Sequence, residues 1–259
     1  MTRVPAMVDY ETRGRVAVLK INRPEKKNAV NGDVARGMEA AIDKLEADPE
    51  VWLGVLTGEG DVFCAGADLK AINEGRAGEI QTERGGFGGI TSRQRTKPII
   101  AAVDGPALAG GTEIVLSCDL VVASSLASFG IPEVKRSLVA AAGGLFRLPR
   151  ALPRNIAFEL GLTGDPISAE RAYHFGLVNE LCEPGQALEA ALALAERIAA
   201  NAPMAVRETL RLMKELPGGD DATGFRESGR AMVELGNTED FWEGPKAFLE
   251  KREPQWKGR

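Results

Sequence analysis

The chain has few of the side chains that carry most metal and nucleophilic chemistry. Its 259 residues include one histidine and three cysteines, and aromatic residues make up only 5%. A single histidine excludes a histidine-rich metal site. Three scattered cysteines without C-x-x-C spacing argue against both a zinc site and a disulfide framework. No G-x-S-x-G motif is present, which disfavours a serine hydrolase of the α/β type.

Long apolar runs and net positive charge are also missing. No stretch reaches 18 apolar residues, and the N-terminus has neither the apolar core of a signal peptide nor an Arg/Ser-rich presequence. We therefore expect a soluble cytoplasmic protein, bacterial in character, that does not bind membranes. The net charge of −5 argues against broad nucleic-acid binding.

The residues that are present predict an α/β core followed by helices. An apolar content of 44% is enough to bury one sizeable core. Short apolar runs alternate with amphipathic segments, which favours an α/β fold with crossover connections. The strands are expected at 16–21, 51–56 and 99–103, and the helices at 34–45, 188–200, 204–216, 222–235 and 244–251. A break near 201–203 divides the chain into a core, 1–200, and a helical region, 201–259.

The segment 73–96 has no sustained period and is predicted to be a mobile loop near a pocket mouth. Its glycine-rich centre, 85–89, resembles a phosphate-binding loop only superficially, because no Gly-Lys-Ser/Thr follows. Cys64 has no histidine partner nearby and is predicted to be a small packing residue. The single His174 is predicted to lie at a helix end before Gly176.

Two glutamates stand in unusually apolar, glycine-marked surroundings. Glu113 lies within GPALAGGTEIVL at 105–116, and Glu133 lies within SFGIPEV at 128–134. A carboxylate among small apolar residues loses hydration, so we expect raised pKa values that allow proton exchange near neutral pH. If both carboxylates face one site, they could divide the work of general acid and general base. Alternatively, either could be structural and pair with Arg136 or Arg147.

Two backbone N–H groups are candidates for holding a carbonyl oxygen. Gly110 is predicted to open a helix, where the first N–H groups lack intrahelical partners and the dipole favours negative charge. Upstream, Gly66 can bend the chain and leave the N–H of Ala67 free, just before a helix that starts at 68–69. If the two converge, they form an oxyanion hole, typically worth about 2.7–4 kcal/mol per donor. A plain glycine turn is the alternative.

Several segments, in order along nearly the whole chain, resemble the crotonase (enoyl-CoA hydratase/isomerase) superfamily. The most specific are FCAGADLK at 63–70 and PIIAAVDGPALAGGTE at 98–113. The match continues through NRP at 22–24, NA at 28–29, CD at 118–119, FGIPE at 129–133, AGG at 142–144, LTG at 162–164, ISA at 167–169, GLV at 176–178 and EGPKAFLEKR at 243–252. Each segment alone is unspecific, whereas the ordered set is specific.

The resemblance implies a spiral of ββα turns with a C-terminal helical trimerisation region, assembled as a homotrimer or a homohexamer. It also implies an enoyl-CoA hydratase, which adds water reversibly and syn to a trans-2-enoyl-CoA thioester in fatty-acid or related acyl-CoA metabolism. Glu113 would deprotonate the water and Glu133 would exchange the proton at C2. Ala67 and Gly110 would form the oxyanion hole. Coenzyme A is part of the substrate, so no separate cofactor is expected.

The resemblance further implies contacts with the substrate. Ala67, Asp68, Leu69 and Lys70 would flank the CoA moiety, together with Gly110. Phe248 and Lys251 are expected near the CoA of the same or an adjacent chain, although the basic residues of the C-terminus can also be solvated surface. Ala140-Ala141 stand where hydratases of the family usually carry Pro-Gly. The N–H of Ala141 could still hold the water, but the acyl pocket should differ.

Other functions are compatible with these residues. Within the family they are an enoyl-CoA isomerase, a carnitinyl-CoA-type dehydratase and an acyl-CoA hydrolase. Outside enzymes, the chain could be a non-catalytic scaffold that binds acyl-CoA. Two buried carboxylates argue against the scaffold, because burying unpaired charge is costly and a retired site has no need of it.

Overall fold

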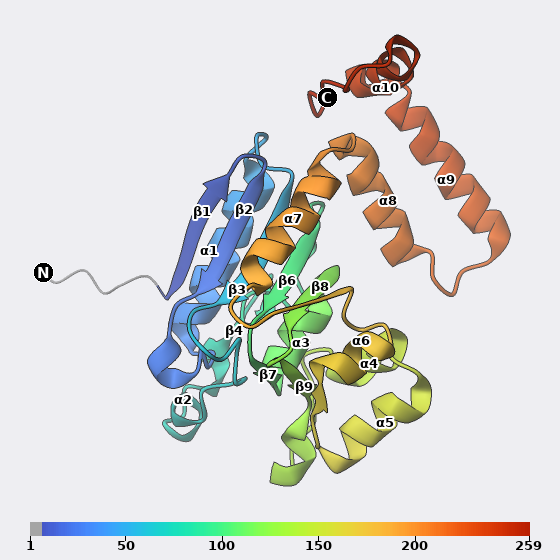
Figure 1. The fold of residues 1–259 in the computed structure, drawn as a ribbon. Coiled ribbons are helices and arrows are strands. Elements are labelled where there is room, and N and C mark those ends of the chain that lie inside the picture. Colours follow the sequence, from blue (N-terminus) through green and yellow to red (C-terminus); the bar gives the residue numbers. More distant parts are fainter. Residues whose placement is uncertain (1–6) are drawn as a thin grey trace, which may run out of the picture.

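A six-stranded sheet forms the centre of the chain in a computed structural model that describes residues 7–259 (Figure 1). β1 and β2 are antiparallel, and each later neighbour along the sheet is parallel to the one before it. The inner strands are almost wholly apolar, as expected where both faces of a parallel sheet are covered. In spatial order the strands are β1 (Val8–Arg13), β2 (Val16–Ile21), β3 (Leu53–Gly58), β6 (Ile99–Val103), β8 (Leu120–Ser124) and β11 (Glu180–Cys182).

A second, shorter row of strand pairings gives the fold its spiral. It consists of β7 (Pro106–Leu108), β9 (Ser128–Gly130) and β10 (Ile167–Ser168). Isolated bridges between Cys64 and Ala107 and between Val30 and Ala67 extend it. A long strand is thus followed by a short extended segment and then a helix, as in β6, β7 and α3 (Gly110–Ser117). This confirms the predicted α/β spiral of ββα turns.

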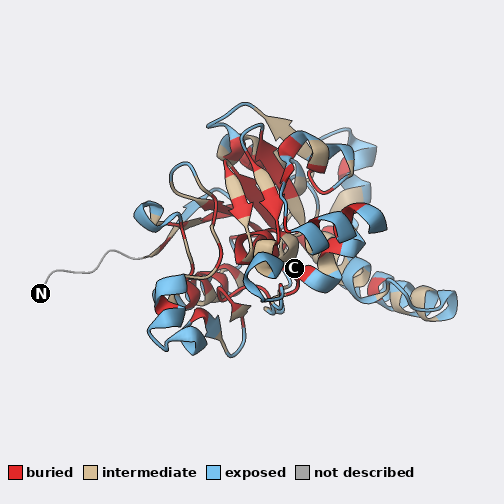
Figure 2. Ribbon diagram, turned by 90° about the horizontal axis from the view of Figure 1, so that it is seen from below, coloured by how far each residue is buried: buried red, intermediate tan, exposed pale blue. Residues whose placement is uncertain are grey.

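Helices cover both faces of the large sheet. On one face of β6, Ile99, Ala101 and Val103 belong to an apolar cluster with α1 (Gly32–Ala47). On the other face, Ile100 and Ala102 belong to a second cluster with α7 (Ala187–Ala199). This alternation follows from the two-residue period of a strand. Figure 2 shows the buried strands at the centre with exposed helices around them. The other α-helices before the C-terminal region are α2 (Leu69–Asn73), α4 (Gly144–Ala151), α5 (Arg154–Thr163) and α6 (Ala169–His174). His174 ends α6, as predicted.

The C-terminal region is helical, as predicted, and extends away from the sheet (Figure 1). It contains α8 (Pro203–Glu215), α9 (Asp221–Leu235) and α10 (Glu239–Glu250). The start predicted for the last helix, at residue 244, was wrong, because the side chain of Thr238 caps the helix by accepting from the N–H of Phe241. The division of the chain at residue 200 stays a prediction. Within residues 7–259, no helix has the length and apolar character needed to cross a membrane.

The segment predicted to be a loop, 73–96, carries short elements of its own. It contains a 3₁₀ turn (Ala77–Ile80) and a hairpin of β4 (Gln81–Thr82) and β5 (Gly86–Phe87). It is tied to α1, because Glu39 accepts hydrogen bonds from the N–H of Gly85 at 2.9 Å and from the hydroxyl of Thr82 at 2.5 Å. Strands of two residues are too short to leave a periodic pattern, so sequence patterns do not predict them.

Candidate active site

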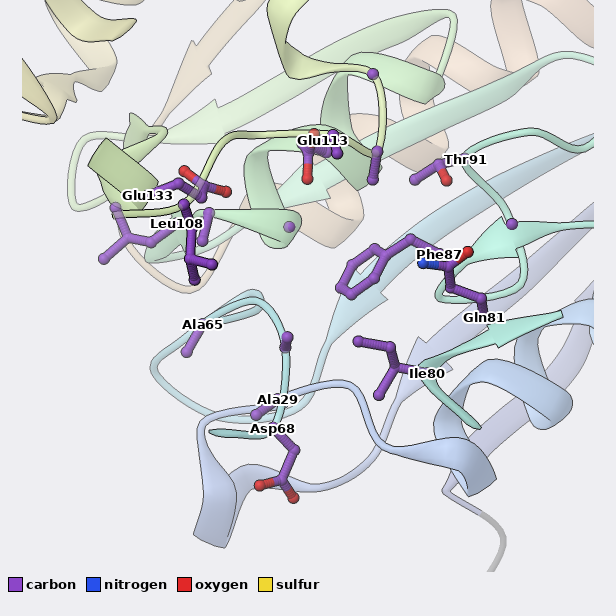
Figure 3. A pocket seen from close by; sticks show the side chains of 18 of the residues that line it. Ala29, Ala65, Asp68, Ile80, Gln81, Phe87, Thr91, Leu108, Glu113 and Glu133 are labelled. Carbon is purple, nitrogen blue, oxygen red and sulfur yellow. The ribbon is translucent and has the colours of Figure 1, made fainter. Parts of the chain in front are cut away.

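A cavity of about 890 Å³ lies where successive turns of the spiral meet. Figure 3 shows Glu113 and Glu133 on one side of it and Ala29 and Asp68 on the other, with Phe87 and Ile80 also at its wall. Eight of the ten predicted site residues line this cavity: Ala67, Asp68, Leu69, Lys70, Gly110, Glu113, Glu133 and Ala141. The fold therefore brings together residues that are far apart in sequence.

The N–H of Ala67 is free because of how its neighbours pair. Val30 donates to the carbonyl of Gly66 at 2.8 Å and accepts from the N–H of Asp68 at 2.9 Å. In such a parallel bridge, the flanking peptide groups face the partner and the N–H of the central residue faces the opposite edge. On that opposite edge, three residues before Ala67, Cys64 is bonded to β7 itself through Pro106 and Leu108. Among residues 7–259, no acceptor contacts the N–H of Ala67.

The second donor, Gly110, lies close to this point. A Cβ added to Gly66 would stand 3.0 Å from the nitrogen of Gly110 and 2.8 Å from the Cβ of Ala109. Only glycine permits that approach, and its φ of 93° adds the same requirement. Gly110 is the first residue of α3, and its N–H has no acceptor among the described residues. The free N–H groups of Ala67 and Gly110 thus belong to directly neighbouring segments.

The backbone before α3 is strained. Ala109 has φ 52° and ψ −126°, a combination that glycine adopts far more easily than alanine. The conformation is held by a 2.9 Å hydrogen bond from the N–H of Ala109 to the carbonyl of Gly130. Strain of this kind gathers at functional sites, where the surrounding structure determines the geometry. Here it fixes the orientation of the peptide group that leads to the N–H of Gly110.

Glu113 is almost completely buried, at 3% exposure, in the first turn of α3. Its Oε1 accepts a 2.9 Å hydrogen bond from the N–H of Gly144, the first residue of α4. Burial raises the pKa of this carboxyl. The N–H groups of Gly144 and Ala142 act in the opposite direction, and the charge of Glu133 adds to the rise. The charge of Glu133 therefore acts on Glu113 across one cavity.

Glu133 follows Pro132 at the start of a 3₁₀ turn (Pro132–Arg136). Its Oε2 is buried and has no hydrogen-bond partner among the described residues. Burial raises the pKa of Glu133, while the nearby charge of Arg136 acts in the opposite direction. A buried carboxyl oxygen without a partner is costly, so it indicates a group kept for exchange with a ligand rather than for stability.

Neither glutamate is a structural ion-pair partner. No salt bridge among residues 7–259 includes Glu113 or Glu133, so the pairing with Arg136 or Arg147 that the sequence left open is not found. Arg147 instead donates to the carbonyl of Thr91 at 2.7 Å. Cys64 is fully buried in the core, as predicted, and burial raises the pKa of its thiol to about 12.

Three residues of the site have no clear signal in the sequence. In the sequence Gly144 stands out only as part of a Gly-Gly pair, although it donates to Glu113. Phe87 packs so closely on Gly110 that a Cβ there would collide with the ring, and Ile80 joins it at the cavity wall. The N–H of Ala142 also counters the rise in the pKa of Glu113. Whether Ala141 holds a water stays a prediction, although it lines the cavity.

Phe248 and Lys251 do not line the cavity of their own chain. Phe248 is 83% exposed on α10, which projects from the core (Figure 1), and Lys251 ends that helix. Both residues stand away from the cavity because α8 to α10 extend outward. Their expected place near the CoA of the same or an adjacent chain stays a prediction.

Free backbone donors beside two carboxyls of raised pKa characterise an enzyme that stabilises an oxyanion and transfers protons. The family profile described as "Enoyl-CoA hydratase/isomerase" matches residues 11–259. The chain belongs to this family.

Individual proteins of known name resemble the chain over nearly its whole length. The chain is 40% identical over 255 residues to the enoyl-CoA hydratase EchA19 of Mycobacterium tuberculosis, covering 96% of both chains. It is 40% identical over 249 residues to the mevalonyl-coenzyme A hydratase sidH of Aspergillus fumigatus, covering 93% of this chain and 91% of that one. The crystal structure of enoyl-CoA hydratase EchA1 from Mycobacterium marinum superposes with a TM-score of 0.94 at 50% identity, covering 98% of this chain and all of that one.

Proposed function

We propose that the chain is an enoyl-CoA hydratase, which reversibly adds water to a trans-2-enoyl-CoA thioester in fatty-acid or related acyl-CoA metabolism. One observation carries the proposal: Glu113 and Glu133, both with raised pKa values, line the same cavity as the free N–H groups of Ala67 and Gly110. Two relatives named as hydratases of CoA esters support it.

The reaction assigns one task to each group. The N–H groups of Ala67 and Gly110 hold the thioester oxygen and stabilise it as it gains negative charge. Glu113 removes a proton from water, and the water oxygen bonds to C3 while the electrons of the double bond move toward the thioester. Glu133 then delivers a proton to C2, which restores the carbonyl. The product is a 3-hydroxyacyl-CoA, and the reverse path is a dehydration.

The substrate in this proposal is a CoA thioester, and no further cofactor takes part. Ala67, Asp68, Leu69 and Lys70 flank the CoA moiety, with Asp68 contributing its backbone rather than its carboxylate. The acyl chain occupies the inner cavity beside Phe87 and Ala141. Ala140 and Ala141 shape this end of the cavity, so we expect a preferred acyl group unlike that of hydratases with Pro-Gly at the same place.

The functional assembly in this proposal is a homotrimer or a homohexamer. Large apolar side chains remain exposed on the C-terminal helices, and such surface normally meets a partner. They are Met213, Phe225, Met232, Val233, Trp242, Phe248 and Leu249. A neighbouring subunit would cover them, and Phe248 and Lys251 would then approach the CoA bound to that subunit.

Loss of absorbance at the enoyl thioester band tests the proposal, with crotonyl-CoA and longer enoyl-CoAs as substrates. We expect the absorbance to fall as water adds, and to fall much more slowly in the double variant Glu113→Gln/Glu133→Gln. Release of free CoA thiol would instead indicate a hydrolase. Conversion of 3-enoyl-CoA to 2-enoyl-CoA without hydration would indicate an isomerase. Binding of acyl-CoA without any turnover would indicate a non-catalytic scaffold.

A further inference from the structure

The segment that carries Ala67 is held by a second segment, residues 27–30. Val30 bonds to the peptide groups on both sides of Ala67, at 2.8 and 2.9 Å, and Lys27 accepts from the N–H of Ala65 at 3.0 Å. With its two neighbouring peptide groups fixed, Ala67 can turn its N–H only if residues 27–30 move. The direction of this donor therefore depends on what holds the second segment.

One guanidinium joins the two segments. Nη1 of Arg23 lies 2.7 Å from Oδ2 of Asp68 and donates to the carbonyl of Ala29 at 2.9 Å. The other oxygen of Asp68 caps α2, accepting from the N–H of Lys70 at 2.9 Å and of Ala71 at 3.4 Å. The Arg23 and Asp68 side chains are only 11% and 14% exposed. Such a pair is little screened by salt and holds its geometry.

Asn28 anchors the same turn from the inside. It is fully buried, and its Oδ1 accepts from the N–H of Arg23 at 2.9 Å. Its Nδ2 donates to the carbonyls of Glu59 at 2.9 Å and Val62 at 2.6 Å, on the chain that leads from β3 toward Ala67. Asn28 has φ 54°, in the left-handed region that asparagine tolerates better than most residues. The amide oxygen thus holds the turn 23–28 closed, and the amide nitrogen holds this turn against residues 59–62.

We propose that Arg23 and Asn28 are positioning residues that act through Asp68 and Val30 to hold the N–H of Ala67 where the thioester oxygen binds. The inference rests on the proposed function, because it takes the thioester oxygen as the ligand. The network ends on the peptide groups beside Ala67 and makes no hydrogen bond to Glu113 or Glu133. It therefore acts on the stabilisation of the oxyanion and leaves proton transfer to the two carboxyls.

Isotope-edited infrared spectroscopy of bound butyryl-CoA, labelled with ¹³C at the thioester carbonyl, measures the strength of the oxyanion contact. Butyryl-CoA has no double bond, so the measurement is independent of hydration. In the parent protein we expect the carbonyl band at lower frequency than in free butyryl-CoA. In Arg23→Gln the shift should shrink, and kcat for crotonyl-CoA should fall about tenfold or more while KM changes less than about threefold. Arg23→Lys, which keeps the charge, should recover part of both.

Arg211→Gln is the matched control, because it removes an arginine with two ion pairs on α8, outside the cavity. It should leave the carbonyl band at the parent position. A folded Arg23→Gln variant with the parent band would overturn the inference, as would an activity loss that only follows the amount of folded protein. If Arg23→Gln does not fold, Asp68→Asn, which keeps an oxygen for the cap of α2, takes its place with the same expectations.

The carbonyl band and the hydration rate together separate the hydratase activity from the positioning role of Arg23 and Asn28. A parent protein that shifts the carbonyl band but hydrates neither crotonyl-CoA nor longer enoyl-CoAs contradicts the hydratase and leaves the positioning role intact. A parent protein that does not shift the band contradicts the oxyanion hole, and the positioning role with it. A shift in the parent that Arg23→Gln keeps contradicts the positioning role alone.

Discussion

The N–H of Gly144 donates a 2.9 Å hydrogen bond to Oε1 of Glu113, so the starts of α4 and α3 meet at one carboxyl group. The contact fixes the side chain in the cavity through Oε1. A peptide N–H at a helix start also favours negative charge, which limits the rise in pKa that burial causes. Glu113 is thereby held as a group that can both accept and release a proton.

The first prediction concerns this contact. A Cβ on Gly144 would lie 2.8 Å from the Cβ of Ala140 and 3.2 Å from Oε1 of Glu113. We expect Gly144→Ala to displace the carboxyl and to lower kcat for crotonyl-CoA by about 10- to 100-fold, because catalysis is sensitive to shifts of about 1 Å. Gly161→Ala on α5 is the matched control, since its Cβ would meet only Cδ1 of Ile131, at 3.6 Å. Equal kcat values in the two variants would contradict the prediction.

The carboxyls themselves are tested by removing their protons while keeping their shape. Glu113→Gln and Glu133→Gln should each reduce kcat by about 10²-fold or more, the usual contribution of general acid–base catalysis. We expect the larger loss for Glu133. Glu159→Gln serves as a control, since Glu159 is exposed and pairs with Arg171 on the protein surface. A Gln variant at either cavity position with parent activity would remove that residue from the mechanism.

Stability should depend on pH in a direction that burial sets. Burial raises the pKa of Glu133 above the value of 4.5 that it has when unfolded, so the folded state binds the proton more tightly than the unfolded state. Stability is then highest below pH 4.5 with respect to this group, and it falls as the pH rises through the folded-state pKa. The neutral variant Glu133→Gln should therefore melt at a higher temperature than the parent at pH 8. The difference in melting temperature should vanish near pH 4. A parent protein that melts above the variant at pH 8 would contradict the prediction.

Phe87 and Gly110 should be energetically coupled. A Cβ on Gly110 collides with the Phe87 ring, so Gly110→Ala should lower the melting temperature and the activity. In Gly110→Ala/Phe87→Ala the collision is gone, and the loss should be smaller than the sum of the two single losses. Contacting residues typically show coupling energies of about 0.5–3 kcal/mol. Additive losses, measured by urea unfolding of all four proteins, would show that the two residues do not touch in solution.

The oligomeric state is tested by light scattering at micromolar concentration. Two phenylalanines on the outer helices, Phe225 and Phe248, are more than four-fifths exposed in one chain, which favours burial by a second subunit. We expect a mass of three or six times 27.6 kDa. Replacing Phe248 by aspartate should weaken the assembly without unfolding the core. A parent mass near 27.6 kDa would reject both the oligomer and any contribution of Lys251 to a neighbour's CoA.

Much of the site could be predicted because its donors are backbone groups. Gly66 and Gly110 mark places where the chain bends or a helix begins, and such places leave N–H groups free whatever the rest of the fold does. The apolar surroundings of Glu113 and Glu133 are visible in the sequence because the residues next to them in the chain are themselves apolar. These are properties of short stretches, which sequence patterns describe well.

The remaining features depend on how distant stretches align. Gly144 meets Glu113, and Phe87 meets Gly110, only because consecutive turns of the spiral stack in one register. Nothing near Arg23 indicates that its partner is Asp68. The place of α10 depends on packing against other chains or its own core, which neither periodicity nor composition specifies.

Cys64 offers an internal probe of how often the oxyanion segment opens. Its sulfur is fully buried, accepts from the N–H of Gly66 at 3.4 Å, and has a pKa raised by burial to about 12, so the folded protein shields it from thiol reagents. Modification then requires that residues 63–67 leave their neighbours. The labelling rate of this one cysteine, followed by mass spectrometry of the peptide that contains it, reports the free energy of that local opening. A bound acyl-CoA should slow the labelling by holding the segment closed.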